Sequence, residues 1–146
     1  MSHDGPWARF ERLIAATDAV ANGSLTRHLL DRAQGTVADL ARKGFDTSKD
    51  PAGASWRRLA KPRRRGRPNR GGPLYDSGAL RRAASAPRIE GDAIVVHVVH
   101  PGATAHYYGT RHIPVRRYLP RGSLSTLWRR ALERDADELF RSVYLR

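Results

Sequence analysis

The chain has 146 residues, the size of one ordinary domain, and 40% of them are hydrophobic, which is enough for one modest core and not for two. It contains no cysteine, which excludes disulfides and thiolate metal sites, and its longest apolar run, Ala93 to Val99, is too short to cross a bilayer. The net charge is +13 and arginine outnumbers lysine by 24 to 3, so we expect an anionic partner: nucleic acid, an acidic protein surface or anionic lipid.

The N-terminal third contains two stretches in which apolar residues recur every three or four positions, the spacing of an amphipathic helix. The first runs from Trp7 to about Ala21, and the second from Leu25 to about Lys43. Between them, Ser24 is the expected N-cap of the second helix, and Gly44 is its expected end. A single kinked helix would satisfy the same spacing, so the sequence leaves both arrangements open.

The next stretch, from Phe45 to Pro73, has no periodicity and is rich in proline and glycine, as expected for a long loop. Trp56 is the largest apolar residue after Phe45, so we expect it to be buried and to fix the loop to the core. Residues 57–70 carry eight basic side chains and no acidic one. Like charges at this density repel each other, which predicts a mobile basic loop over about residues 57–73.

A small sheet is expected in the second half of the chain. Gly78 begins a short helical turn, capped by Asp76 or Ser77, and should occupy a backbone conformation that disfavours a side chain. The sequence Glu-Gly-Asp at 90–92 is typical of a turn. A strand follows from Ala93 to His100, and its almost continuous apolar character implies cover on both faces.

The stretch from Leu124 to about Tyr144 has a strong amphipathic pattern, with Ser123 as its expected cap. Its exposed side is predicted to be the most acidic patch of the protein, formed by Glu133, Asp135, Asp137 and Glu138. Helices at both ends around a small, mostly antiparallel sheet predict a single α+β domain over residues 1–146.

Histidines and acids are the candidates for a catalytic or metal site, namely His97, His100, His106, His112, Asp76, Glu90 and Asp92. His97 and His100 are three positions apart on a predicted strand, so their side chains point to opposite faces. The sequence contains no nucleotide-binding loop, zinc-protease helix or nucleophile elbow. We therefore expect no enzymatic activity, no cofactor and no metal site, and we interpret these histidines as structural.

The basic loop contains Arg-Gly-Arg-Pro at 65–68, which is similar to an AT-hook that lays arginines into a narrow minor groove. The match is four residues long and occurs once, so contact with phosphates without base preference is the favoured interpretation. Contact with an acidic protein neighbour is the alternative. The residues expected to make this contact are Arg63, Arg64, Arg65, Arg67 and Arg70.

Four short motifs occur in order between the flanking helices. Residues 45–59 contain a phenylalanine, then D-P-x-G, then W-x-x-L, and residues 74–80 read L-x-D-S-G-x-L. Residues 106–109 read H-x-x-G, and residues 113–119 read I-P-x-R-x-Y-L. Together they resemble the phage virion morphogenesis family, the tail completion proteins that include the Mu-like G and P2-like S proteins.

The resemblance implies a structural, non-enzymatic virion protein that joins the top of the tail to the head-side connector. Such a protein would form a homo-oligomeric ring, expected to be a hexamer, in the neck of the virion after assembly in the host cytoplasm, with no membrane contact. Its expected neighbours are the connector and the tail terminator or tail tube protein, with nonspecific contact to genomic DNA in the channel. A small DNA-binding accessory protein that uses the arginine-rich loop is the alternative.

Two complementary surfaces are expected to form the subunit and partner interface. One is the basic aromatic segment after His106, and the other is the acidic side of the final helix. Leu119, within the basic aromatic segment, is expected to point inward to the core. The interface residues are Tyr107, Tyr108, Arg111, Arg116, Arg117, Tyr118, Glu133, Asp137 and Glu138. Structural roles within the four motifs fall to Trp56, Asp76, Gly78, His106, Gly109 and Pro114.

Overall fold

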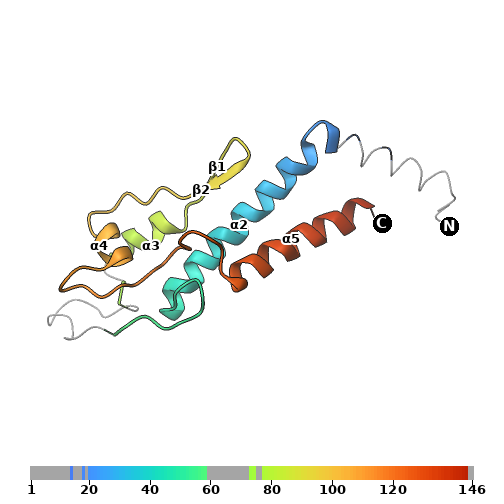
Figure 1. Cartoon of the computed structure of the whole chain (residues 1–146). Coiled ribbons are helices and arrows are strands. Elements are labelled where there is room, and N and C mark those ends of the chain that lie inside the picture. Colours follow the sequence, from blue (N-terminus) through green and yellow to red (C-terminus); the bar gives the residue numbers. More distant parts are fainter. Residues whose placement is uncertain (1–13, 15–17, 19, 59–72, 75–76, 145–146) are drawn as a thin grey trace.

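Helix α2 (Ser24–Thr47) forms the centre of the fold (Figure 1). The computed structural model describes residues 14, 18, 20–58, 73–74 and 77–144. After α2 come α3 (Ala79–Ala84), β1 (Arg88–Glu90), β2 (Ala93–Val95), α4 (Ala103–Tyr108) and α5 (Thr126–Tyr144). Helix α5 packs along one side of α2, and α3 and the two strands pack against another side. This arrangement confirms the α+β class.

The start of α2 is set by a glycine. Gly23 has φ 73°, in the left-handed region, so the helix is broken here and is not continuous with the residues before it. The side-chain oxygen of Asn22 accepts a hydrogen bond from the Ser24 N–H at 3.0 Å, and Ser24 is the first helical residue rather than the cap. Most of the helix expected over residues 7–21 lies outside the described residues.

The expected end of α2 at Gly44 is wrong, because the helix continues for almost one more turn. Phe45 follows Ala41 by four positions, and both are buried at 3% and 1% exposure, so packing favours the extra turn. The helix ends at Thr47 and is capped by Ser48, whose φ is 53° and whose N–H donates to the Phe45 carbonyl at 3.3 Å. A Cβ on Gly44 would lie 3.1 Å from the Lys49 carbonyl oxygen, so glycine there lets the chain turn closely over the helix end.

Strands β1 and β2 form an antiparallel hairpin whose two-residue turn, Gly91 and Asp92, lies within the Glu-Gly-Asp sequence predicted as a turn. Arg88 pairs with Val95, and Glu90 pairs with Ala93. Gly91, the first turn residue, has φ 63°, a conformation that glycine adopts at little cost. The turn prediction is therefore confirmed.

The strand expected from Ala93 to His100 is much shorter, because β2 ends at Val95. Within the described part of the chain, the sheet has only two strands, so residues 96–100 have no further strand to pair with. The side chain of Val99 is 90% exposed, which overturns the expectation of cover on both faces. A run of β-branched residues favours extended backbone, but pairing requires a partner.

Two hydrophobic clusters form the core. The larger consists of Phe45, Trp56, Leu74, Leu80, Ala84, Ala103 and Tyr118. The smaller lies between α2 and α5 and consists of Val37, Ala41 and Trp128. Leu119 packs against both clusters, which confirms that it points inward and joins the two halves of the core.

Helix α5 begins two residues later than expected, and its cap is Ser125 instead of Ser123. The Ser125 hydroxyl accepts from the Trp128 N–H at 3.4 Å and donates to the Pro51 carbonyl at 2.6 Å. The apolar face of α5 is only partly covered, because Trp128 is buried whereas Leu127 and Phe140 are about half exposed. In the described part of the chain, no helix is long and apolar enough to cross a membrane.

Candidate partner-binding site

The D-P-x-G motif forms a tight turn that delivers Trp56 to the core. The Asp50 carboxylate accepts hydrogen bonds from the backbone N–H groups of Ala52 and Ala54 at 3.0 and 2.8 Å. The Asp50 N–H donates to the Ala54 carbonyl at 2.8 Å, and Gly53 completes the turn with φ 95°. Trp56 is 6% exposed, so the prediction that it is buried is confirmed.

Three hydrogen bonds, running in both directions, join the tryptophan motif to the I-P-x-R motif, about 60 residues further along the chain. The indole N–H of Trp56 donates to the Arg117 carbonyl at 2.8 Å. In the other direction, the Arg116 guanidinium donates to the carbonyls of Arg57 and Arg58 at 2.9 and 3.4 Å. Each motif thus satisfies polar groups of the other at the edge of the larger cluster.

The H-x-x-G motif closes the same loop from the other side. His106 lies in the last turn of α4 and Gly109 is its C-cap. This short helix was not predicted from the sequence. The Arg116 N–H donates to the His106 carbonyl, and the Thr110 N–H donates to the Ile113 carbonyl, both at 2.8 Å. Gly109 has φ 77° and ψ 166°, a combination that is essentially restricted to glycine. The segment after α4 is therefore a fixed loop.

The L-x-D-S-G-x-L motif begins α3 and packs Leu74 and Leu80 into the larger cluster. Gly78 has φ 76°, which confirms that it occupies a conformation unfavourable for a side chain. The Ser77 hydroxyl accepts from the Ala79 N–H at 3.3 Å, whereas Asp76 lies outside the described residues. All four motifs thus meet around one hydrophobic cluster.

A bidentate ion pair that sequence reasoning missed ties α3 to α2. Arg81 donates through Nε and Nη2 to the two carboxylate oxygens of Asp46, at 3.0 Å each. Arg81 follows the L-x-D-S-G-x-L motif directly, but Asp46 lies beyond the end predicted for α2, which extends three residues past Gly44. The pairing could not be seen from spacing alone.

Two of the predicted interface residues lie in the interior, which corrects their assignment. Arg116 is 3% exposed, because its guanidinium is used for the carbonyls described above. Tyr118 is 4% exposed and donates its hydroxyl to the Ala103 carbonyl at 3.1 Å. Burial, with Tyr107 and Tyr108 nearby, raises the pKa of Tyr118 to about 12.

The remaining aromatic and basic residues are more accessible. Tyr107 is half-buried and donates to the Pro120 carbonyl at 2.9 Å, while Tyr108 is 56% exposed and meets Tyr107 edge to face. Arg111 and Arg117 are exposed. Arg121, which was not predicted, lies 5.2 Å from the centre of the Tyr108 ring and adds a cation–π contact.

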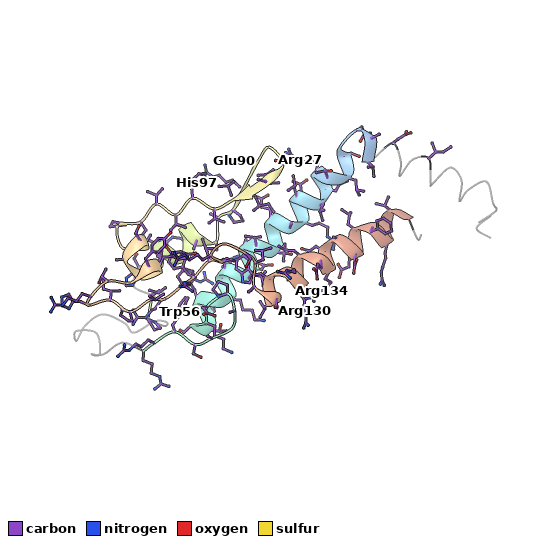
Figure 2. All side chains as sticks on the ribbon, in the orientation of Figure 1. Arg27, Trp56, Glu90, His97, Arg130 and Arg134 are labelled. Atoms are coloured by element: carbon purple, nitrogen blue, oxygen red, sulfur yellow. The ribbon has the colours of Figure 1, made fainter. Side chains whose placement is uncertain are left out.

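The acidic side of α5 is less acidic than expected. Glu138 pairs with Arg32 of α2 at 2.6 Å within the same chain, so part of its charge is already compensated. Glu133 and Asp137 are exposed, but each has an arginine, Arg130 or Arg134, three positions before it on the same helix (Figure 2). The outer face of α5 therefore has mixed charge. The five arginines predicted for the basic loop, Arg63, Arg64, Arg65, Arg67 and Arg70, lie outside the described residues.

The histidines do not converge. His97 on the outside of the hairpin pairs with Glu90 at 2.9 Å (Figure 2), and the His100 Nδ1 accepts from the Gly102 N–H at 3.1 Å. His106 is half-buried, and its Nδ1 atom is buried without a hydrogen-bond partner. Across the described residues, no group of three or more potential ligands could hold a metal ion.

The half-buried His106 is expected to make the stability of the protein depend on pH. Burial, together with the charges of Arg116 and His100, lowers the pKa of His106 below its ordinary value of 6.5. The unfolded chain then binds this proton more readily, so the free energy of unfolding should begin to fall below about pH 6.5, and the loss is complete below the lowered pKa. Denaturant unfolding from pH 8 to 5 should show a shallower pH dependence for His106→Gln than for the wild type. Identical slopes would exclude this contribution.

No protein-family model, curated protein or solved structure matches this chain. The four motifs and the way they pack are therefore the grounds on which a function is proposed.

Proposed function

We propose that this chain is a structural component of a phage or prophage tail, a tail completion protein that joins the tail to the head-side connector. The observation that carries the proposal is the convergence of the four motifs. Segments spread from Phe45 to Leu119 supply the residues of one cluster, and they bond to each other through Trp56 and Arg116. If the four motifs had arisen by chance, there would be no reason for them to pack around the same hydrophobic cluster.

A structural role fits the chemistry of the described residues. Among the described residues, the histidines and carboxylates are spread over the hairpin, α4 and α5, and no three of them come together as a possible metal site. The accessible features are instead Tyr108 at the end of α4 and arginine side chains on the loop that follows it, a composition enriched at the centres of protein interfaces. In this proposal, copies form a ring through that loop, and the ring contacts the connector on one side and the tail on the other.

The charge balance supports a DNA-binding accessory protein as the second candidate. The net charge is +13, and the arginine run begins at Arg57 and Arg58, which are exposed and have no acidic partner among the described residues. In the tail proposal, the same charge would face acidic neighbours or the genome in the channel.

The test is deletion of the gene from the phage or prophage that carries it. After induction, electron microscopy should show filled heads and separate tails, and supplying the wild-type chain in trans should restore joined particles. The tagged protein should be present at the neck of purified virions. Intact infectious particles formed without the protein would contradict the proposal.

A further inference from the structure

A basic cavity of about 620 Å³ lies between the start of the arginine run and the loop after α4. Thr110, Ile113 and Pro114 form part of its wall. The other lining residues are all basic or titratable, namely Arg57, Arg58, His106, Arg111, His112 and Arg116. Among the described residues, no acidic side chain lines the cavity, so the charged groups placed there are all positive or neutral.

Arg116 is the unusual member of this set, because it is a buried charge with no counter-ion among the described residues. Its guanidinium donates to two neutral carbonyls, and it is 3% exposed. Burial, followed by the charge of Arg57, lowers the pKa of Arg116, as expected for a cation held in an electropositive, poorly solvated place. Buried charges in proteins are normally paired, because desolvation of an isolated ion is costly.

Other arginines of the protein do have carboxylate partners. Arg27, Arg32, Arg42 and Arg81 each lie within 4 Å of an aspartate or glutamate oxygen. In the described part of the chain, no carboxylate lies within that distance of an arginine that lines the cavity. Eight further described arginines also lack such a partner, but all of them are exposed, so among the described residues the buried unpaired guanidinium is that of Arg116 in this cavity.

We propose that the cavity is a binding site for an acidic segment of a partner protein, which inserts a glutamate or aspartate carboxylate between the arginines. Guanidinium groups bind carboxylates through paired, charge-assisted hydrogen bonds. The loop is already fixed, because the Thr110 hydroxyl accepts from the N–H groups of His112 and Ile113 at 3.3 and 3.0 Å. Little ordering is then required when the segment binds.

The apolar surroundings favour a peptide over a nucleic acid backbone. Ile113 and Pro114 form part of the cavity wall, and Val115, the next residue, is 48% exposed. A peptide has apolar side chains to cover these groups, whereas a phosphate backbone offers only charge and sugar. The inference rests on the proposed function in one respect: the acidic segment belongs to a protein that neighbours this chain in the assembly.

The test measures binding of fluorescein-labelled decaglutamate by anisotropy at about 0.15 M salt, where the screening length is about 8 Å. The cavity variant is Arg58→Gln with Arg111→Gln, which removes two exposed charges and leaves the Arg58 carbonyl bond to Arg116 intact. The control variant is Arg130→Gln with Arg134→Gln on α5, which makes the same change in net charge outside the cavity. Thermal melting of both variants checks that the fold is kept.

We expect the cavity variant to bind decaglutamate about tenfold more weakly than the wild type, and the control variant to differ by less than about twofold. Equal losses in both variants would show general attraction to a basic protein, and no binding by the wild type would show that the cavity does not take a chain of carboxylates. Either result would overturn the site. A short labelled DNA duplex forms the second arm. Selective loss of duplex binding in the cavity variant, with decaglutamate binding unchanged, would make this a phosphate site. Because the assay uses isolated protein, its failure is distinct from failure of the gene-deletion experiment.

Discussion

Replacing Trp56 with alanine is expected to lower the free energy of unfolding by about 3–5 kcal/mol, the usual cost of removing a buried large aromatic side chain. Trp56 is 6% exposed and meets Phe45 edge to face, with ring centres 5.4 Å apart. The substitution also leaves the Arg117 carbonyl without its indole donor. Denaturant unfolding followed by circular dichroism measures the change.

Two further variants separate the parts of this effect. Trp56→Phe keeps a ring in the cluster but removes the N–H donor, so we expect a smaller loss of about 1–2 kcal/mol. Val99→Ala truncates a side chain that is 90% exposed and should change the stability by less than about 0.5 kcal/mol. If Trp56→Ala and Val99→Ala had equal effects, Trp56 would not be an anchor of the core.

Replacing Gly109 with alanine should have the second-largest effect, about 2–4 kcal/mol, from backbone strain and steric overlap together. With φ 77° and ψ 166°, Gly109 is in a region that residues with a Cβ rarely enter. A Cβ there would lie 2.8 Å from Val115 Cγ2 and 3.2 Å from the Ile113 carbonyl oxygen. The loop that lines the basic cavity would have to shift, and we expect a lower melting temperature and weaker decaglutamate binding.

Gly122→Ala is the matched control for this prediction. Gly122 also has a positive φ, 71°, but a Cβ there would meet nothing within 4 Å. This variant should therefore lose only the conformational part, about 1 kcal/mol. Equal losses in the two variants would mean that crowding against Val115 contributes nothing.

The sequence predicted those parts of the fold that depend on local pattern. Periodic apolar residues located α2 and α5, and the glycine at position 91 located the hairpin turn. The end of α2 was missed because burial of Phe45 outweighed the tendency of Gly44 to stop a helix. The strand after residue 95 was missed because β-branched residues predict extended backbone but not the presence of a partner strand.

The site was harder to predict, because it depends on contacts between distant segments. Arg116 was expected to face a partner, because arginines usually face outward. Its guanidinium instead binds the carbonyls of Arg57 and Arg58, which lie almost 60 positions earlier in the chain. Helix α4 has only six residues, and threonine, histidine and tyrosine in it are modest helix formers, so no periodic pattern marked it. The order of the motifs along the chain was visible in the sequence, whereas the contacts between them are visible only in the structure.

The packing of α5 on α2 has a consequence for how the chain is made. Thr47 ends α2 and Thr126 begins α5, so a ribosome adding about 5–20 residues per second needs roughly 4–16 s to travel between them. During that interval Val37 and Ala41 have no Trp128 to cover them. The nascent chain thus presents an uncovered apolar helix for seconds, long enough for a chaperone or another unfinished copy to bind before α5 emerges.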